Sequence, residues 1–382
     1  MSPVPLWPLT LRRNFMSQYS TGNASRLAVA AARDLGSQFV NNPHKMIGQD
    51  GAFSVPLNDR EALWFFGDTL IGTRPTGQSL WYIDRKPVGH ADMTGRGTIQ
   101  RMINNTGLLL RDRTGRNGLR EFTYICDEAG QLRPLISLEG GEHPDWDRIW
   151  CQHGITIGQK VYLSFIKVKM LAEESAPMPV PFEIVGSGLA VGSPADWTFR
   201  RVLHNGTSLL WRAEQPHFAT SMLLHDDLVY LYGTVKQGDV QNCYVARARS
   251  DQLEDIGSYE YLVGHEPTWS RDLSRAVVIF SNMPSELSVS YNAYVGSYLA
   301  VHSLDLTGKI VGRTAPNPWG PWDEPVVLWT VNVKRDQPLP YPVLIYAGKE
   351  HPEISEDGGR IIYLTYIEFE EYFPHLIEVK LQ

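Results

Sequence analysis

The segment Gly51–Thr69 reads GAFSVPLNDREALWFFGDT and predicts a β-hairpin. Its two halves are rich in apolar and β-branched or aromatic residues, and the polar turn NDRE separates them. The same order of apolar strand, short polar turn and second strand recurs four more times, in His153–Val168, Phe218–Val235, Ser288–Leu304 and Glu353–Phe369. A hairpin repeated five times is therefore the main evidence for the fold.

A third strand is expected after every hairpin, in Asn104–Asp112, Gly186–Ser193, Cys243–Ser250, Ile310–Asn317 and His375–Leu381. The units begin near residues 51, 153, 218, 288 and 353, so the last three intervals are nearly equal and the first is longer. The longer interval predicts an insertion around Thr73–Gly97. A solenoid would repeat every 20–45 residues, roughly, and a sandwich would not repeat one hairpin five times.

These units predict an all-β protein: a single domain over residues 1–382, folded as a closed five-bladed β-propeller with an active-site funnel on its axis. Residues 1–46 are expected to wrap or close the ring, and Phe39–Val40 is the candidate strand that completes the last blade. A long amphipathic helix is expected nowhere, except at Ala24–Leu35.

Composition excludes several other classes of protein. The net charge is −7 and the Lys and Arg residues form no cluster, so nucleic acid is not an expected partner. No apolar run approaches the roughly 18 residues of a membrane span. The three cysteines lack metal-site spacing and no secretory signal is visible at the N-terminus, so a cytoplasmic location is expected. The oligomeric state stays open.

Polar residues stand just before the first strand of each unit. In a propeller these strands line the axis, so the residues before them meet on one face. They are Asp50, the pair Gln152–His153, the stretch Glu214–His217, Glu286 with Ser288, and His351 with Glu353. Asp and His also stabilise turns, so each position alone has a structural alternative. Their convergence is what predicts a polar axial site.

Asp50 and Asp68 form the most specific pair. If NDRE is the turn, Leu57 faces Glu61, and the same register places Asp50 opposite Asp68. Directly opposed residues lie about 5 Å apart, and two carboxyl groups that close raise the pKa of one of them. Such a pair can supply an acid and a base to one site. The alternative for Asp68 is a cap on the turn of FGDT.

The histidines His153, His217 and His351 come from different units and form no short metal-binding motif. Hydroxyl recognition is therefore preferred over metal binding, no cofactor is expected, and an axial cation is left open. The tryptophans near expected loops could stack on sugar rings or pack in the core: Trp81, Trp146, Trp150, Trp269 and Trp319. No GxSxG elbow, Walker loop or dinucleotide fingerprint is present.

Several phrases resemble those of five-bladed propeller glycoside hydrolases: DGAFSVPL, LWFFGDTLIG, NNTGLLL, VYLYGT with YVARA, and HPEIS followed by IIYLTY. The FGDT phrase looks most like a family formerly of unknown function that includes endo-D-arabinanases. Arabinanase and arabinofuranosidase propellers are related to it. The resemblance covers Ile47–Gln382. It implies a furanoside-type glycan as substrate, with Asp50 matching the aspartate that opens the first blade and Asp68 matching the FGDT aspartate.

The chain departs from this pattern in two ways. It has no visible export signal, and Gln152 with His153 stands where many propeller glycosidases place an acid. The identity of the acid catalyst is therefore open.

The expected function is a glycoside hydrolase acting on an arabinan-like oligo- or polysaccharide. Asp50 is expected as nucleophile or base, with Asp68 or Glu286 as the acid or pKa partner. The expected substrate-binding residues are His153, Glu214, His217, Ser288, His351, Glu353 and Asn105. The alternatives are a non-catalytic carbohydrate-binding propeller, and a lyase or transferase on the same scaffold.

Overall fold

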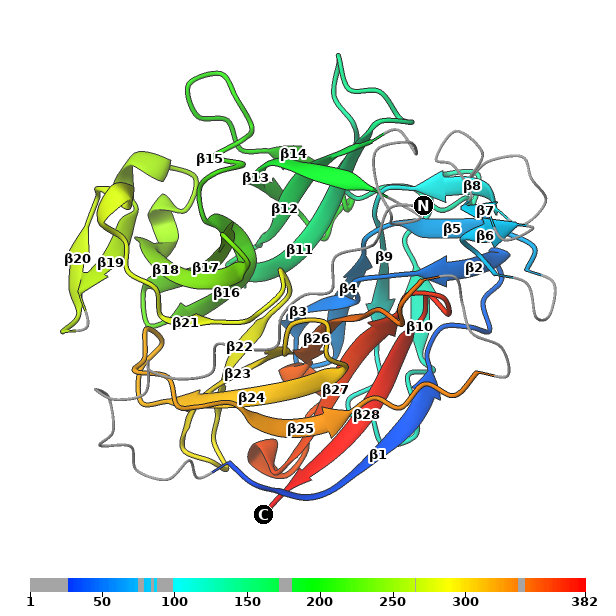
Figure 1. Ribbon diagram of the computed structural model, residues 1–382. Helices are drawn as coiled ribbons and strands as arrows, with labels where there is room; N and C mark the ends of the chain where they lie inside the picture. The colour runs from blue at the N-terminus through cyan, green and yellow to red at the C-terminus, as the bar shows by residue number, and fades with distance from the viewer. Residues whose placement is uncertain are drawn as a thin grey trace, which may run out of the picture.

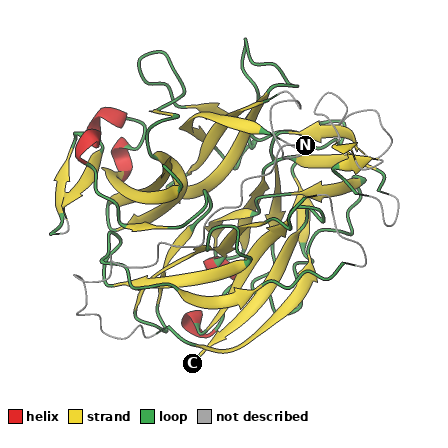
Figure 2. Ribbon diagram, in the orientation of Figure 1, coloured by secondary structure: helices red, strands yellow, loops and turns green. Residues whose placement is uncertain are grey.

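The computed structural model describes residues 27–74, 79–83, 86–87, 99–171, 181–264, 266–335 and 341–382. Over these residues the protein is built of β-strands, as the sequence predicts (Figure 2). The helical segments in the described ranges are single 3₁₀ turns: η3 (Ser250–Gln252), η4 (Ile256–Ser258), η5 (Leu273–Arg275), η6 (Pro352–Ile354) and η7 (Asp357–Gly359). No helix in these ranges has the length and apolar character needed to cross a membrane.

Within the described ranges the strands form five larger sheets and two small ones. The first sheet holds β3 (Phe53–Asn58), β4 (Glu61–Phe66), β9 (Thr106–Leu110) and β10 (Phe122–Tyr124). The second holds β11 (Asp147–Ile157), β12 (Lys160–Met170), β13 (Phe182–Gly192), β14 (Phe199–Arg201) and β15 (Trp211–Arg212). The third holds β16 (His217–His225), β17 (Leu228–Gln237), β18 (Val240–Arg249), β19 (Glu260–Gly264), β20 (Thr268–Ser270) and β21 (Phe280–Ser281).

The fourth sheet holds β22 (Ser288–Asn292), β23 (Ser297–Ser303), β24 (Lys309–Ala315) and β25 (Val326–Thr330). The fifth holds β26 (Ile345–Glu350), β27 (Ile361–Glu368), β28 (Pro374–Leu381) and the N-terminal β1 (Val29–Ser37). The small sheets are β2 (Met46–Gln49) with β5 (Thr69–Gly72) and β8 (Ile99–Ile103), and β6 (Tyr82–Ile83) with β7 (Lys86–Pro87).

The five larger sheets lie around a common centre (Figure 1). Their first strands contact one another in chain order, β3 with β11, β11 with β16, β16 with β22, and β22 with β26. A hydrogen bond between Ser54 Oγ on β3 and His351 Nδ1, next to β26, joins the first sheet to the last at 2.7 Å. Residues at the entrances to these strands are thereby brought together from distant parts of the chain.

The N-terminal strand completes the last sheet, but it is not the strand expected from sequence. β1 pairs with β28 in antiparallel register, with Val29 opposite Leu381. The expected closing segment, Phe39–Val40, lies outside any strand. The expected helix at Ala24–Leu35 is also wrong for its described part, because residues from Val29 onward are in β1. The edge of β28 explains why this segment is a strand. Its backbone N–H and C=O groups need hydrogen-bond partners, which a neighbouring strand supplies and a short helix does not.

The last hairpin also differs from expectation. Its first strand is β26, which ends before the phrase HPEIS, and the residues of that phrase form the turn η6. Pro352 begins this turn, where its missing N–H and fixed φ are tolerated. The expected insertion at Thr73–Gly97 falls mostly outside the described residues.

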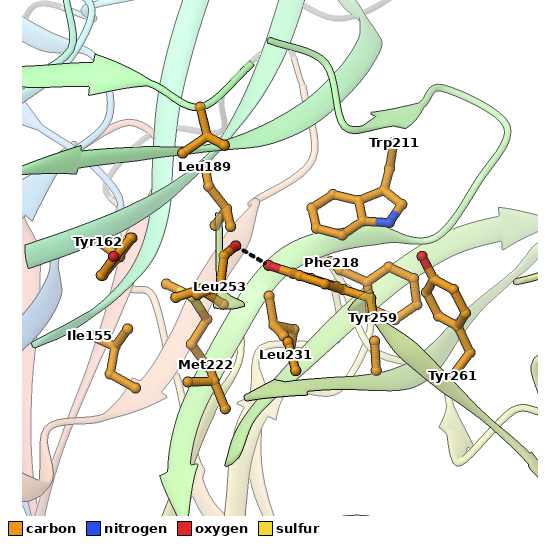
Figure 3. Packing of buried hydrophobic residues seen from close by; sticks show 14 of the residues in the cluster. Ile155, Tyr162, Leu189, Trp211, Phe218, Met222, Leu231, Leu253, Tyr259 and Tyr261 are labelled. Atoms are coloured by element: carbon orange, nitrogen blue, oxygen red, sulfur yellow. Dashed lines mark hydrogen bonds between the residues drawn. The ribbon is translucent and has the colours of Figure 1, made fainter. Parts of the chain in front are cut away.

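The core lies between the sheets. Between the second and third sheets, Leu189 packs with Met222 and Leu231, and Trp211 lies against Phe218 with ring centroids 5.4 Å apart (Figure 3). The buried Tyr259 hydroxyl donates a hydrogen bond to the Leu253 carbonyl at 2.7 Å. This packing between adjacent sheets buries the apolar faces that the repeated hairpins present.

Candidate active site

Asp50 and Asp68 face each other where one hairpin ladder is interrupted. The pair Phe53–Phe65 in β3 and β4 and the pair Gln49–Thr69 in β2 and β5 share one register. That register places Asp50 opposite Asp68, as the sequence predicts. The Asp50 N–H donates to the Asp68 carbonyl at 3.3 Å, and the Gly67 N–H donates to the Asp50 carbonyl at 3.0 Å.

The backbone beside Asp50 leaves the ordinary strand conformation. Gly51 has φ +81° and Ala52 has φ +57°, both in the left-handed region. An alanine adopts this region at a cost, and such strain is found preferentially at functional sites. Together with Asp50, these two residues separate β2 from β3, so that Asp50 lies at the junction of two sheets.

Both carboxyl groups line a cavity of about 280 Å³, near the lower end of the volumes of ligand pockets. Its wall comes from several sheets and is largely apolar: Asp50, Gly51, Phe53, Gly67, Asp68, Trp81, Trp150, Cys151, Gln152, Phe182, Glu286, Leu306, Leu344, Tyr346, Phe369 and Tyr372. The cavity is thus a small, mostly apolar pocket in which few polar groups can hold a ligand.

The environment raises the pKa of both aspartates. Burial raises the pKa of Asp50 to about 7, and the nearby Asp68 and Glu286 carboxylates add to this. Hydrogen bonds from Tyr346 and Tyr372 act in the opposite direction, and the Tyr346 hydroxyl lies 3.0 Å from Asp50 Oδ2. Burial raises the pKa of Asp68 to about 6, but the Arg148 guanidinium, 3.8 Å away, holds it lower than burial alone would.

Glu286 is the third carboxyl group of the pocket. It lies in the loop before β22, and burial raises its pKa while the Lys349 ammonium opposes the shift. Lys349 is 2% exposed, and burial lowers its own pKa to about 7. Its Nζ donates to the carbonyl oxygens of Gly51 and Ala347, so this side chain also ties the start of β3 to β26.

Gly67 of the FGDT phrase leaves room for the Asp50 carboxylate. A Cβ atom at position 67 would lie 2.5 Å from Asp50 Oδ1, closer than real Cβ contacts. The glycine is therefore required by the position of the carboxylate and not by its own φ. This explains why the phrase that carries Asp68 also carries a glycine.

The substitution Gly67→Ala is expected to displace the Asp50 carboxylate and to lower catalytic turnover at least about 100-fold, because small misplacements of reacting groups have effects of this size. Turnover of the substrate found for the wild type measures it. Gly140→Ala is the matched control, since a Cβ there meets nothing within 4 Å. An active Gly67→Ala variant would contradict the placement of Asp50.

The other residues expected at the site are placed differently. His351 is fully buried outside the pocket lining, bonded to Ser54 and Thr365 and stacked on Trp64 at 4.0 Å. Burial lowers its pKa well below the usual value and keeps the ring neutral. Glu353 lies beside His351, 4.0 Å from its Nδ1, and burial raises its pKa to about 7.

Ser288, His153 and His217 are also outside the lining. The Ser288 hydroxyl accepts a hydrogen bond from the Glu350 N–H at 2.7 Å. His153 Nδ1 accepts one from the Met222 N–H at 3.1 Å, and burial lowers the pKa of His153 to about 4. His217 is 5% exposed at the start of β16, and burial lowers its pKa to about 4.

Glu214 and Asn105 take still other positions. Glu214 is exposed in the turn before β16. Asn105 is fully buried, and its amide makes four hydrogen bonds to backbone groups of Leu135, Ile136 and Ile149. Of the ten predicted site residues, the structure thus brings only Asp50, Asp68 and Glu286 together in the pocket.

Of the five tryptophans considered from sequence, Trp81 and Trp150 line the pocket. Trp81 is 1% exposed and stacks on Phe369, whereas Trp150 meets Phe182 edge-to-face at 4.7 Å. Trp269 and Trp319 pack against each other at 6.1 Å, and Trp146 is exposed. In the described ranges, no group of three or more His, Cys, Asp or Glu side chains could hold a metal ion.

Comparison with solved structures gives similar folds at low sequence identity. A proposed hydrolase from Bacteroides ovatus ATCC 8483 is 16% identical, with a TM-score of 0.58, and the match covers 91% of this chain and 87% of that one. Zg3597, a family 117 glycoside hydrolase from Zobellia galactanivorans, is 9% identical, with a TM-score of 0.50, and covers 91% and 90%. These likenesses support a propeller-like arrangement of the sheets.

The search of curated proteins gave no significant match to this sequence. The family model described as a domain of unknown function, DUF4185, matches residues 34–378, which include both aspartates and every sheet. The chain therefore belongs to the DUF4185 family.

Proposed function

We propose that the protein is a glycoside hydrolase acting on a furanoside-type, arabinan-like glycan in the pocket at Asp50 and Asp68. The observation that carries the proposal is a pair of aspartates at opposed backbone positions, whose carboxyl groups line one mostly apolar cavity and have raised pKa values. Glycoside hydrolysis requires two carboxyl groups beside the scissile bond, one protonated and one ionised.

The electrostatics suggest which group holds the proton. Asp68 lies beside Arg148, which favours its ionised form, whereas Asp50 is flanked by two other carboxyl groups that favour its protonated form. Asp50 is therefore proposed as the general acid and Asp68 as the nucleophile. These roles reverse the expectation from sequence, which had no information on Arg148.

The opposed backbone positions of Asp50 and Asp68, for which Cβ atoms about 5 Å apart are typical, favour hydrolysis with retention of the anomeric configuration. Retaining enzymes hold their two carboxyl groups about 5–5.5 Å apart. The Asp68 carboxylate attacks the anomeric carbon while the bond to the leaving oxygen breaks, and that oxygen takes the proton of Asp50. Asp50 then removes a proton from water, which attacks the anomeric carbon and releases Asp68. The pair ends in its starting protonation state.

The substrate class follows from the resemblance noted in the sequence and from the pocket itself. A small cavity with aromatic and aliphatic walls fits one sugar ring. The five larger sheets are proposed to be the blades of a closed five-bladed propeller, with β1 completing the last blade. This places the aspartates of the first blade at the axial entrance.

The proposal is tested by following arabinan and arabinogalactan with ¹H NMR after addition of the protein. We expect signals of new furanose reducing ends. The first of these signals should have the same anomeric configuration as the linkage that was cleaved. Binding without new reducing ends would instead support a non-catalytic carbohydrate-binding propeller.

The rate is expected to depend on pH as a bell. Above about pH 7 the acid Asp50 loses its proton, and below about pH 6 the nucleophile Asp68 becomes protonated, so kcat/KM falls on both sides. Because the two carboxyl groups interact, the two apparent pKa values of the pH profile describe the pair and not the individual residues. Rates measured from pH 4 to pH 9 on one substrate check this, and a rate that rises steadily to pH 9 would be inconsistent with an acid of this pKa.

A further inference from the structure

Gln152 occupies a β-bulge at the pocket wall. In the pairing of β11 with β12, Cys151 is opposite Phe165 and His153 is opposite Ser164, so Gln152 has no partner across the ladder. Ser164 fixes the bulge, since its Oγ accepts a hydrogen bond from the His153 N–H at 3.1 Å. Bulges next to active sites redirect a side chain, and here Gln152 lines the cavity while the neighbouring His153 ring bonds to Met222 elsewhere.

The side-chain oxygen of Gln152 has no hydrogen-bond donor among the described residues. Gln152 is 5% exposed, its Oε1 is buried, and this oxygen accepts no hydrogen bond from any residue in the described ranges. A buried amide oxygen without a donor is uncommon in a folded protein and is destabilising. The arrangement is explained if a ligand supplies the donor.

The surroundings of Gln152 limit what that ligand can be. Trp150 and Phe182 give the pocket an apolar surface, and Asp50, Asp68 and Glu286 supply carboxyl groups. A neutral sugar ring fits both features. Its C–H faces pack against the apolar side chains, and its hydroxyl groups donate to the free amide oxygen. An anionic sugar would be repelled by the carboxylates.

We propose that Gln152 recognises one hydroxyl group of the furanose ring in the pocket, with its Oε1 accepting the hydroxyl proton, and so determines specificity for that sugar. This inference rests on the proposed function. It extends that function by naming Gln152 as a specificity residue and a neutral, hydroxyl-bearing ring as the group that it binds. A site built to bond a substrate hydroxyl discriminates strongly against the analogue that lacks it.

The test uses 4-nitrophenyl α-D-arabinofuranotrioside and its 2-deoxy and 3-deoxy analogues, each altered in the ring next to the aglycone. The full-length wild type is compared with Gln152→Met, which keeps the size of the side chain and removes the amide. Gln131→Met, at an exposed position outside the pocket lining, is the matched control. We expect Gln152→Met to lower kcat/KM at least about 30-fold on the parent compound. On one of the two deoxy analogues, the variant should hydrolyse the substrate no more slowly than the wild type does.

The melting temperature gives a second readout. Because Gln152→Met removes an unpaired buried oxygen, it should leave the melting temperature of the unliganded protein unchanged or higher, which a structural role for the amide would not allow. Equal losses on all three substrates, or no loss on any, would overturn the inference while leaving the hydrolase intact. A wild type that hydrolyses none of them, nor arabinan, would overturn the proposed function and this inference with it.

Discussion

Replacing Asp50 by Asn is expected to reduce kcat at least about 1,000-fold, with the protein still folded. The amide keeps the shape of the side chain but cannot give a proton to the leaving oxygen, and proton transfer by a positioned acid contributes about 10²–10⁴-fold. Asp68→Asn should lose at least as much, because an amide cannot form the covalent intermediate. The double variant should lose little more than Asp68→Asn, since the two groups act as a unit.

Glu214→Gln is the matched control for these variants. It makes the same change from carboxylate to amide at an exposed position outside the pocket, so it should retain wild-type kcat. Initial rates on a saturating substrate and melting temperatures measured together separate lost chemistry from lost folding. Less than a tenfold loss for both aspartate variants would exclude the pair as the catalytic groups.

The second large effect is expected from removing β1. Leu27 and Val29 pack in the core of the last two sheets, and β1 covers the backbone of β28. Deleting residues 1–37 should lower the free energy of unfolding by about 2–5 kcal/mol, because full burial of a side chain such as Leu27 contributes about 1.5–3 kcal/mol and the half-buried Val29 contributes less. It also leaves β28 as an exposed edge, so aggregation on heating should increase.

Deletion of residues 1–26 serves as the reference for this experiment, because the difference between the two deletions isolates residues 27–37. Urea unfolding followed by tryptophan fluorescence gives the free energies. Equal stability of the two deletions would contradict a closing role for β1. The substitution Arg33→Ala gives a milder comparison, since the Arg33–Glu378 ion pair is exposed to solvent and such pairs add little to stability.

The first four hairpins could be predicted from sequence because each is a local feature, whereas the first strand of the last one lies before the expected segment. The turn NDRE marks the hairpin, but Asn58 and not Leu57 pairs with Glu61, and the register shifts by one between Asn58 and Pro56. Beyond this bulge Phe53 pairs with Phe65 as expected, and that register carries Asp50 to its position opposite Asp68. The third strands were equally visible. β1 was not, because its sequence alone suits a short helix and only the edge of β28, about 340 residues away, makes it a strand.

The site was predictable only where one hairpin contains it. Tyr346, Tyr372 and Arg148 adjust the pKa values of the two aspartates, but they come from other parts of the chain and no local motif marks them. Lys349 carried a signal that could have been used, since a lysine lies among apolar and small residues in IYAGKE. Such a residue is buried only with partners, here the Gly51 and Ala347 carbonyls.

The histidines and Glu353 were predicted to line the site only because they precede the first strand of a unit, and none of them lines the pocket. The sequence places them near the axis, but it does not indicate which of two neighbours faces the cavity. At the second sheet the bulge after Cys151 turns Gln152 into the pocket and His153 toward Met222. A one-residue irregularity reverses the faces of a strand, and periodicity alone does not reveal it.

The most direct test of the central claim is a measurement of reducing ends released from arabinan, arabinogalactan and fructan by the purified protein, with Asp50→Asn in parallel. Release by the wild type from an arabinofuranose-containing glycan, and none above background by the variant, is the result expected. Equal release by both proteins, or no release from any glycan by a folded wild type, would contradict a hydrolase centred on Asp50 and Asp68.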